Sequence, residues 1–316
     1  MKTRKLGKPG IELSTVGLGT WAHGGGDWSF SWGPQDDERS KKTIYAAIDA
    51  GINWVDTAPA YGLGHAEEVL GQALKEIMPA PFVATKCGLV WNGTRQIKSN
   101  LAAESIRAEC EASLKRLQID TIDLYQVHWP MPDEQIEEGW GEVAKLIEEG
   151  KVRFGGVSNF SVAQMERAHA IHPIASLQPP YSMLARDVEK DVLPFCGKNG
   201  IGVVAYSPLQ KGLLTGKITK EYVAGLAPDD HRKKKDKMFQ EPQLSEILAK
   251  VEKLRPIARA KKISLAQLAI AWVLRREEIT AAIAGGRTPE QIRDTAAAMD
   301  VTLTDVEVGE IEQILA

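Results

Sequence analysis

The sequence predicts an α/β barrel of eight parallel strands, the (β/α)8 or TIM-barrel fold, and three observations support this prediction. Eight short apolar runs recur along the 316 residues, and a helix-like stretch follows each of them. The runs are almost continuously apolar, as expected for strands buried on both faces. Polar side chains stand where several runs end, and this is the end of such a barrel that carries the active site. We expect one domain over residues 1–316.

Each element of this barrel has its own sequence signal. Residues 3–16 are expected to form an N-terminal β-hairpin, because Gly7-Lys8-Pro9-Gly10 is a typical turn. Acidic residues, serines and glycines mark the helix ends. The predicted strands are 16–21, 52–56, 81–86, 122–128, 152–158, 174–178, 201–206 and 279–284. The predicted helices are 36–50, 65–77, 99–117 (opening at Ser99), 133–149, one from Ser161, 187–199 and 288–299, with extra helices at 243–261, 264–276 and 303–315 and a long polar segment at 207–241.

A doubly wound sheet is the alternative fold. It would place a dinucleotide fingerprint, G-x-G-x-x-G, after the first strand and before a helix. The segment Gly17-Leu18-Gly19-Thr20-Trp21 lacks both the third glycine and the helix behind it. The barrel therefore remains the preferred interpretation.

The composition limits the kinds of partner and setting. A hydrophobic content of 43% and a charged content of 26% are ordinary for a globular protein, and the net charge of −3 favours neither nucleic acid nor a membrane surface as a partner. The cysteines Cys87, Cys110 and Cys196 form no metal-binding or disulfide pattern, so we expect reduced thiols and a cytoplasmic protein. No apolar stretch reaches the 18 residues of a membrane span.

Four polar residues are candidates for catalysis because they follow neighbouring predicted strands. Asp56, Lys86 and His128 end the second, third and fourth runs, and Tyr61 comes five residues after Asp56. A phenol is a weak acid, with a reference pKa of about 10, and a nearby ammonium is expected to lower that pKa. Tyr61 beside Lys86, with Asp56 anchoring the lysine, is then a proton donor, and His128 can orient a substrate oxygen. A carbonyl activated in this way accepts a hydride, which no side chain supplies, so a nicotinamide cofactor is implied.

With these motifs in place, the chain resembles the aldo-keto reductase superfamily over nearly its whole length. The matching segments are Asp56-Thr57-Ala58-x-x-Tyr61-Gly62, Thr85-Lys86, Val127-His128-Trp129-Pro130, Gly156-Val157-Ser158-Asn159-Phe160, Gln178, Tyr206-Ser207-Pro208-Leu209 with Gly212-Leu213, and Gly285-x-Arg287-x-x-x-Gln291. The segment 62–68 looks more like the bacterial branches that handle sugars and aldehydes.

The resemblance implies roles for individual residues. Tyr61 matches the general acid, Lys86 and Asp56 the pair that lowers its pKa, and His128 the orienting histidine. The residues implied in binding the cofactor are Thr20, Trp21 and Asp56 near the reacting end; Ser158, Asn159 and Gln178 at the nicotinamide carboxamide; Tyr206 stacked on the nicotinamide ring; Ser207, Leu209, Gly212 and Leu213 at the pyrophosphate; and Gly285, Arg287, Gln291, Asp294 and Thr295 at the adenosine end.

The adenosine end departs from the family pattern, which usually has Ile-Pro-Gly and then Glu-Asn. This chain has Ile283-Ala284-Gly285, and later Asp294-Thr295. Asp294 keeps an acceptor for the adenine amino group, whereas Thr295 replaces an amide by a hydroxyl. The guanidinium of Arg287 suits a 2′-phosphate, so we expect NADP(H), with NAD(H) as the alternative.

Three further features have both a functional and a structural interpretation. Trp21, Trp28, Trp32, Trp91 and Trp129 fall in or beside predicted loops at the active end and favour an aromatic substrate wall over core packing. The basic run 231–237 is typical of a solvated loop, although it falls in a segment that in the family often folds over the cofactor. His65, Glu67 and Glu68 lack a second histidine at metal-binding spacing, so we expect helix capping and a solvated face, and no metal.

The favoured function is an NADP(H)-dependent reductase of aldehydes or ketones, or a sugar or polyol dehydrogenase in the reverse direction. Its expected partner is a small carbonyl or sugar substrate, and its oligomeric state, monomer or homo-oligomer, is left open. A cofactor-binding, weakly catalytic regulatory subunit of the same superfamily is the alternative. A third interpretation, a barrel aldolase with Lys86 as a Schiff base, requires a desolvated Lys86 that is not paired with Asp56.

Overall fold

The computed structural model describes residues 2–26, 28–227 and 230–316, and its central feature is a closed barrel of eight parallel strands. The strands follow one another around the barrel in the order β10-β11-β12-β3-β4-β5-β8-β9. Their bounds are β3 (Val16–Gly19), β4 (Trp54–Asp56), β5 (Phe82–Cys87), β8 (Ile122–Val127), β9 (Val152–Ser158), β10 (Ser176–Gln178), β11 (Gly202–Ala205) and β12 (Ile279–Gly285). The barrel prediction is confirmed, and the doubly wound alternative is wrong.

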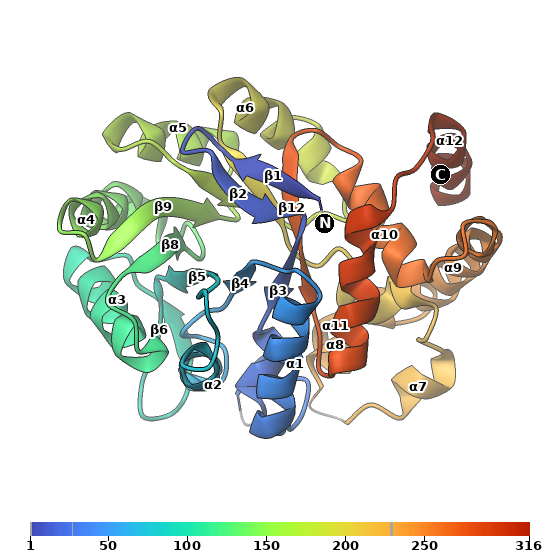
Figure 1. Ribbon diagram of the computed structural model, residues 1–316, viewed down its shortest axis with the longest axis horizontal. Helices are drawn as coiled ribbons and strands as arrows, with labels where there is room; N and C mark the ends of the chain where they lie inside the picture. The colour runs from blue at the N-terminus through green and yellow to red at the C-terminus, as the bar shows by residue number, and fades with distance from the viewer. Residues whose placement is uncertain (1, 27, 228–229) are drawn as a thin grey trace.

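Helices surround the barrel, as Figure 1 shows. Those that connect or follow the strands are α1 (Asp37–Asp49), α2 (His65–Leu74), α3 (Ala103–Leu117), α4 (Ile136–Glu148), α5 (Val162–Ile171), α6 (Val192–Asn199), α10 (Leu265–Leu274), α11 (Pro289–Ala296) and α12 (Asp305–Leu315). Side-chain caps begin many of them. The Asp36 carboxylate accepts the Arg39 N–H at α1, and Ser161 and Thr304 form capping boxes at α5 and α12. Across the described ranges, no helix is long and apolar enough to cross a membrane.

The predicted N-terminal hairpin is present and covers one end of the barrel. It consists of β1 (Thr3–Leu6) and β2 (Ile11–Ser14), which pair antiparallel. Leu6 and Leu13 are fully buried in a cluster with Trp54 from β4. The Trp54 ring also explains a glycine in β3, because a Cβ on Gly17 would lie 2.1 Å from it. The hairpin therefore closes the end of the barrel opposite the strand ends that carry the candidate site.

The segment between β11 and α10 is more structured than the sequence suggested. The part expected as a long polar segment contains a 3-10 helix (Gln210–Thr215), α7 (Lys220–Ala224), α8 (His231–Lys235) and a second 3-10 helix (Lys237–Phe239) before α9 (Gln243–Ala260). Leu213, Ile218, Val223, Phe239 and Leu244 form a small core of their own. The segment between β11 and α10 is therefore folded around its own small core, and this core holds the basic residues of the segment in defined positions.

The start of the third helix was predicted wrongly. Ser99, expected to open the third helix, belongs to β7 (Ile97–Ser99), which pairs with β6 (Leu89–Trp91) in a hairpin that the sequence analysis missed. The α3 helix starts only at Ala103. Two residues earlier, the Leu101 N–H donates to the side-chain oxygen of Gln135. Cross-strand pairing thus overrides the capping signal of the serine.

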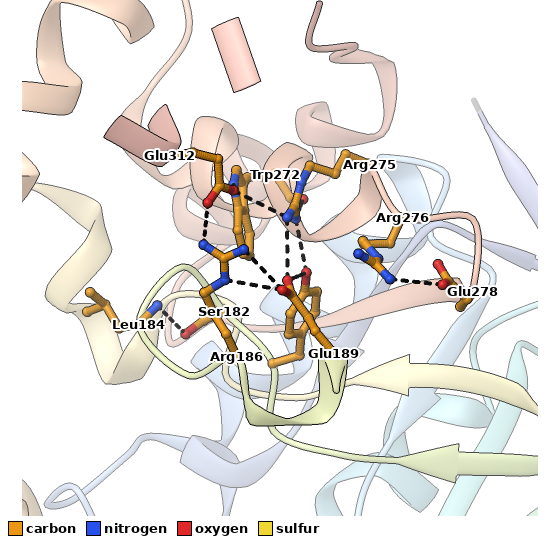
Figure 2. A network of polar contacts seen from close by, with 10 residues as sticks. Ser182, Leu184, Arg186, Glu189, Trp272, Arg275, Arg276, Glu278 and Glu312 are labelled. Atoms are coloured by element: carbon orange, nitrogen blue, oxygen red, sulfur yellow. Dashed lines mark hydrogen bonds and ion pairs between the residues drawn. The ribbon is translucent and has the colours of Figure 1, made fainter. Parts of the chain in front are cut away.

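The last helix is held to the barrel by a network of charged and aromatic side chains. Figure 2 shows Glu312 of α12 between Arg186, Arg275 and Trp272. Glu312 accepts a hydrogen bond from Trp272 Nε1 (3.1 Å) and forms ion pairs with Arg186 and Arg275. The Arg275 guanidinium lies 3.5 Å from the centre of the Trp272 ring. Glu189 joins the same network from the segment after β10.

Candidate active site

Lys86 brings three of the four candidate catalytic side chains together. Its Nζ lies 2.6 Å from Asp56 Oδ1, 2.9 Å from the Thr57 carbonyl oxygen and 3.1 Å from the Tyr61 hydroxyl. Asp56 ends β4, Lys86 lies near the end of β5, and Tyr61 lies in the loop that follows β4. All three side chains are buried. The predicted constellation therefore exists as a compact hydrogen-bonded group.

The charges in this group set the protonation of the phenol and the amine. Burial alone would lower the pKa of Lys86, but Asp56 and Tyr61 outweigh it, and the net pKa is raised. Burial raises the pKa of Tyr61, and Lys86 only partly opposes that rise. The expected net lowering of the Tyr61 pKa is therefore not found, because desolvation of the phenolate exceeds the attraction of the ammonium. Tyr61 is a protonated phenol beside a lysine that carries its charge.

His128 completes the group from the end of β8. Its ring packs edge-on against Tyr61, with 6.0 Å between the ring centroids. Burial and the charge of Lys86 lower the pKa of His128 well below its usual value, so the imidazole is neutral. In the described part of the chain no side chain or backbone group bonds to its ring nitrogens, which leaves them able to contact a ligand.

The loop that presents Tyr61 depends on close backbone packing. Gly62 has a positive φ of 65°, and a Cβ there would lie 2.1 Å from the Gly24 carbonyl oxygen. The next helix, α2, is fixed by Glu67, which was expected on a solvated face but is fully buried. Glu67 accepts hydrogen bonds from Thr85 Oγ1 (2.6 Å) and Arg116 Nε (2.7 Å). It therefore joins α2 to the residue beside Lys86 and to α3.

The residues expected at the carboxamide form a connected polar group. Asn159 Nδ2 donates to Ser158 Oγ (3.0 Å), and Ser158 Oγ donates to the Gln178 carbonyl oxygen (2.8 Å). The Tyr206 hydroxyl donates to Asn159 Oδ1 over 2.8 Å. Gln178 Nε2 donates to Asp56 Oδ2 (2.8 Å) and to Gln126 Oε1 (3.2 Å). The structure thus connects these residues directly to the Asp56–Lys86–Tyr61 group.

Gln126 is part of this group, and the sequence analysis missed it. It is fully buried, and its Nε2 lies 3.3 Å from Asp56 Oδ2. Side chains alternate along a strand, and Leu124, Gln126 and His128 share one face of β8. The sequence signal that could have identified Gln126 is its position: a polar residue in an apolar strand, two residues before His128 and so on the same face.

The loop after β11 has the features of a phosphate site. Ser207, Gln210, Lys211 and Gly212 all have positive φ angles, and such turns arrange successive N–H groups around an anion. In the part of the chain that the structure describes, the Ser207 and Leu209 N–H groups donate to no acceptor. Leu213 is buried in the small core of the insertion, so it anchors this loop. The residues present therefore fit a pyrophosphate.

The loop after β12 holds Arg287 beside the tryptophan-rich loop, the segment that carries Trp28 and Trp32. The Arg287 guanidinium donates to Gln35 Oε1 (2.9 Å) and to the carbonyl oxygens of Trp32 and Pro34. Burial lowers the pKa of Arg287, and the nearby charges of Arg232 and Arg39 lower it as well. Three guanidinium groups thus raise the positive potential here, which suits a phosphate.

The remaining residues expected at the adenosine end have partners within the protein. Gly285 ends β12 and is exposed, and Gln291 Oε1 accepts the Arg287 N–H over 2.8 Å. Asp294 accepts hydrogen bonds from Gln267 and Ser264 near the neighbouring helix, and the Thr295 hydroxyl donates to the backbone of its own helix.

Thr20, expected at the reacting end of the cofactor, lies next to the catalytic candidates: its hydroxyl donates to the Asp56 carbonyl oxygen over 3.1 Å.

An aromatic cluster covers Tyr61, but it contains only part of the expected wall. The Trp21 and Trp28 rings lie 5.1 and 6.2 Å from the Tyr61 ring, and Trp32 lies 6.4 Å from Trp21. Phe30, not predicted, joins the same cluster. Trp91, in β6, and Trp129, which is exposed, have no aromatic contact with this cluster among the described residues.

The basic run is not simply a solvated loop. Arg232 is buried, pairs with Asp230 at 2.8 Å and lies 5.2 Å from the centre of the Trp32 ring. His231 packs against Phe30, with ring centroids 5.4 Å apart. The α8 segment therefore contacts the tryptophan-rich loop directly.

The fold and the site together describe a parallel barrel with a buried, hydrogen-bonded group of Asp56, Lys86 and Tyr61 at the ends of its strands. The sequence model of the Aldo/keto reductase family matches residues 15–316, so the chain belongs to that family. It is 41% identical to the aldo-keto reductase YhdN of Bacillus subtilis, over all of this chain and 94% of the relative. It is 38% identical to the NADH-specific methylglyoxal reductase of Escherichia coli, over 97% of this chain and 96% of the relative.

A solved structure agrees with the fold. The glycerol dehydrogenase AKR11B4 from Gluconobacter oxydans superposes with a TM-score of 0.90 at 40% identity, covering 99% of this chain and 95% of that one. The aldolase interpretation is unsupported, because Lys86 is charged and paired with Asp56. The chain is an oxidoreductase of the aldo/keto reductase family.

Proposed function

We propose that this protein reduces aldehydes or ketones with NADP(H), or oxidises sugars or polyols in the reverse direction, and that Tyr61 is its general acid and base. The observation that carries the proposal is the buried contact of Lys86 Nζ with both the Tyr61 hydroxyl (3.1 Å) and Asp56 (2.6 Å). A protonated phenol beside a fixed ammonium can give its proton to a carbonyl oxygen, and the ammonium then stabilises the phenolate.

The other side chains have supporting roles in this proposal. His128, as a neutral imidazole, donates a hydrogen bond to the substrate oxygen and positions it near Tyr61. Trp21 and Trp28 cover Tyr61 and exclude water from it. When bound, the nicotinamide supplies or accepts the hydride.

The cofactor would lie along the ends of β9–β12. The N–H groups of Ser207 and Leu209 would bind the pyrophosphate, and Arg287, with Arg232 and Arg39 near it, would bind a 2′-phosphate. This cluster of guanidinium groups is the reason to propose NADP(H), although a relative with 38% identity is named as NADH-specific. Small aldehydes are the first substrates to examine, because that relative is named for methylglyoxal.

A cytoplasmic setting is part of the same proposal. Its support is that Cys87, Cys110 and Cys196 are all buried free thiols, as is usual in a reducing compartment.

The test is a fluorescence titration of the purified protein with NADPH and with NADH, followed by methylglyoxal, other short aldehydes and glycerol. Tighter binding of NADPH and its oxidation on addition of an aldehyde are expected. Tight binding without turnover over the whole panel would favour the regulatory subunit. If neither nucleotide binds, the proposed function is wrong.

A further inference from the structure

Gln126 occupies a position that neither packing nor direct contact with a substrate explains. It lies inside the barrel on β8, one pleat before His128, and is fully buried. A Cβ on Gly156 of the next strand would come within 3.1 Å of the Gln126 side chain, so this site is closely packed. An apolar residue of the same size would fill the space equally well, without the cost of burying an amide.

The amide of Gln126 is oriented by its two partners. Its Nε2 donates to Asp56 Oδ2 (3.3 Å), and its Oε1 accepts from Gln178 Nε2 (3.2 Å). Gln178 Nε2 also donates to Asp56 Oδ2 (2.8 Å). The two amides therefore both donate to one carboxylate oxygen, while the other oxygen of Asp56 accepts from Lys86.

This arrangement leaves only one polar atom of the Gln178 side chain, the amide oxygen, free to bind a ligand. An amide nitrogen has two hydrogens, and the bonds to Asp56 and Gln126 use both of them. Only Gln178 Oε1 then remains to contact a ligand, so Gln178 can hold a carboxamide only by accepting its N–H. Rotation of the Gln178 amide to donate instead would break both bonds.

We propose that Gln126 is a positioning residue that, together with Gln178, connects the nicotinamide carboxamide site to the Asp56–Lys86–Tyr61 proton donor. The inference rests on the proposed function, and it adds a coupling between cofactor recognition and proton transfer. Gln126 fixes the direction in which Gln178 presents its oxygen. The same two amides fix Asp56 so that its Oδ1 faces Lys86, and Lys86 in turn contacts Tyr61.

The test compares Gln126→Met with the unaltered protein in two kinds of measurement. Methionine keeps the length of the side chain and removes both hydrogen bonds. The first measurement is the Kd for NADP+ and for 2′-phospho-ADP-ribose, which lacks the nicotinamide. The second is kcat and its pH profile with saturating NADPH and an aldehyde. Thr280→Val is the control, because it also removes a buried hydrogen-bonding group from a barrel strand, but at the start of β12, where the Thr280 hydroxyl donates to the Lys5 carbonyl oxygen of the N-terminal hairpin.

We expect Gln126→Met to weaken NADP+ binding and to lower kcat by about 10-fold each, the usual effect of losing a hydrogen bond to a charged group. The Kd for 2′-phospho-ADP-ribose should stay within about 2-fold, because this ligand lacks the nicotinamide and makes no hydrogen bond at the carboxamide site. The basic limb of the pH profile should move to higher pH, because the less neutralised Asp56 raises the Tyr61 pKa further. The control should change none of these.

A double variant, Gln126→Met with Gln178→Met, tests whether the two amides act together. If they do, the double variant loses about as much NADP+ affinity and kcat as the more damaging single variant.

Unchanged kcat, pH profile and Kd for NADP+ in a folded Gln126→Met protein would show that Gln126 only fills space. If Gln126→Met does not fold, Gln178→Met alone decides: a loss of NADP+ affinity with full kcat at saturation would overturn the coupling. An unaltered protein that binds no nucleotide would instead contradict the proposed function.

Discussion

Lys86 Nζ lies 3.1 Å from the Tyr61 hydroxyl and 5.0 Å from the centre of its ring. The ammonium therefore contacts the phenol at its oxygen and does not stack on its face. Because burial keeps Tyr61 protonated, the lysine does not ionise the phenol in the resting protein. It stabilises the phenolate that would exist after the proton has been given to a substrate.

Replacing Tyr61 by phenylalanine should remove nearly all turnover. General acid catalysis is worth about 10²- to 10⁴-fold in rate, so kcat for NADPH-dependent aldehyde reduction should fall by about that factor. The Kd for NADPH should stay within a few-fold, because the ring and its packing are kept. Tyr45→Phe is the control, since the Tyr45 hydroxyl bonds to Glu76 at the surface. Normal turnover of Tyr61→Phe would disprove the proton-donor role.

Replacing Arg287 by alanine should change the preference between the two nucleotides. Loss of charge-assisted hydrogen bonds to a 2′-phosphate should weaken NADPH by about 10- to 100-fold. NADH should weaken only within about 3-fold, through the lost contacts of Arg287 with Trp32 and Pro34. Fluorescence titration with both nucleotides measures the two effects. Arg293→Ala, at an exposed arginine on the following helix α11, controls for net charge. Equal losses for both nucleotides in Arg287→Ala would show that Arg287 does not recognise a 2′-phosphate.

The strand ends of the site were predictable because each of Asp56, Lys86 and His128 interrupts an apolar run at its end. Period-two alternation then places them on the inner face of the barrel. Gln126 obeys the same alternation, but it lies within a run and lacks a motif of its own. Its role depends on Asp56 and Gln178, which lie 70 and 52 residues away from Gln126 in the sequence.

The sequence could not reveal which polar groups are already committed to other parts of the fold. Arg287 bonds to a loop more than 250 residues earlier, and Asp294 bonds to Gln267 of the neighbouring helix. Neither contact has a local signal. The predicted helix start at Ser99 was wrong for a related reason. A serine before a helical pattern indicates a helix cap, but Ser99 pairs with Leu89 of another strand, and its own neighbours in the sequence do not indicate that pairing.

Removing Glu312 should loosen the last helix. The carboxylate accepts from Trp272 and pairs with Arg186 and Arg275 (Figure 2). Because the Glu312 side chain is one-third exposed, solvent screens these pairs, and Glu312→Ala should cost about 1–2 kcal/mol of unfolding free energy. Glu312→Gln should cost less, since it keeps an acceptor for the indole. Urea unfolding measures both, and Glu310→Ala, exposed on the same helix, is the control. A Glu312→Ala protein as stable as the control would show that the network contributes nothing.

Glu109 gives the stability of the protein a dependence on pH near neutrality. Burial raises the pKa of Glu109 from 4.5 to about 7, although the Gly88 N–H and the Ser105 hydroxyl both donate to its carboxyl group. The folded protein therefore binds a proton more tightly than the unfolded chain does. This contribution is fully present below pH 4.5 and is lost as the pH rises through 7.

Glu109→Gln should remove this dependence while its amide oxygen still accepts the Gly88 N–H. Relative to the unaltered protein, the variant should gain up to about 3 kcal/mol of unfolding free energy between pH 5 and pH 8, at 1.36 kcal/mol for each unit of pKa shift. Urea unfolding at the two pH values measures the gain, and other titrating groups cancel in the comparison. Glu104→Gln, on the exposed first turn of the same helix, should show no such difference. If Glu109→Gln differs from the unaltered protein by the same amount at both pH values, Glu109 is not the group that titrates in this range.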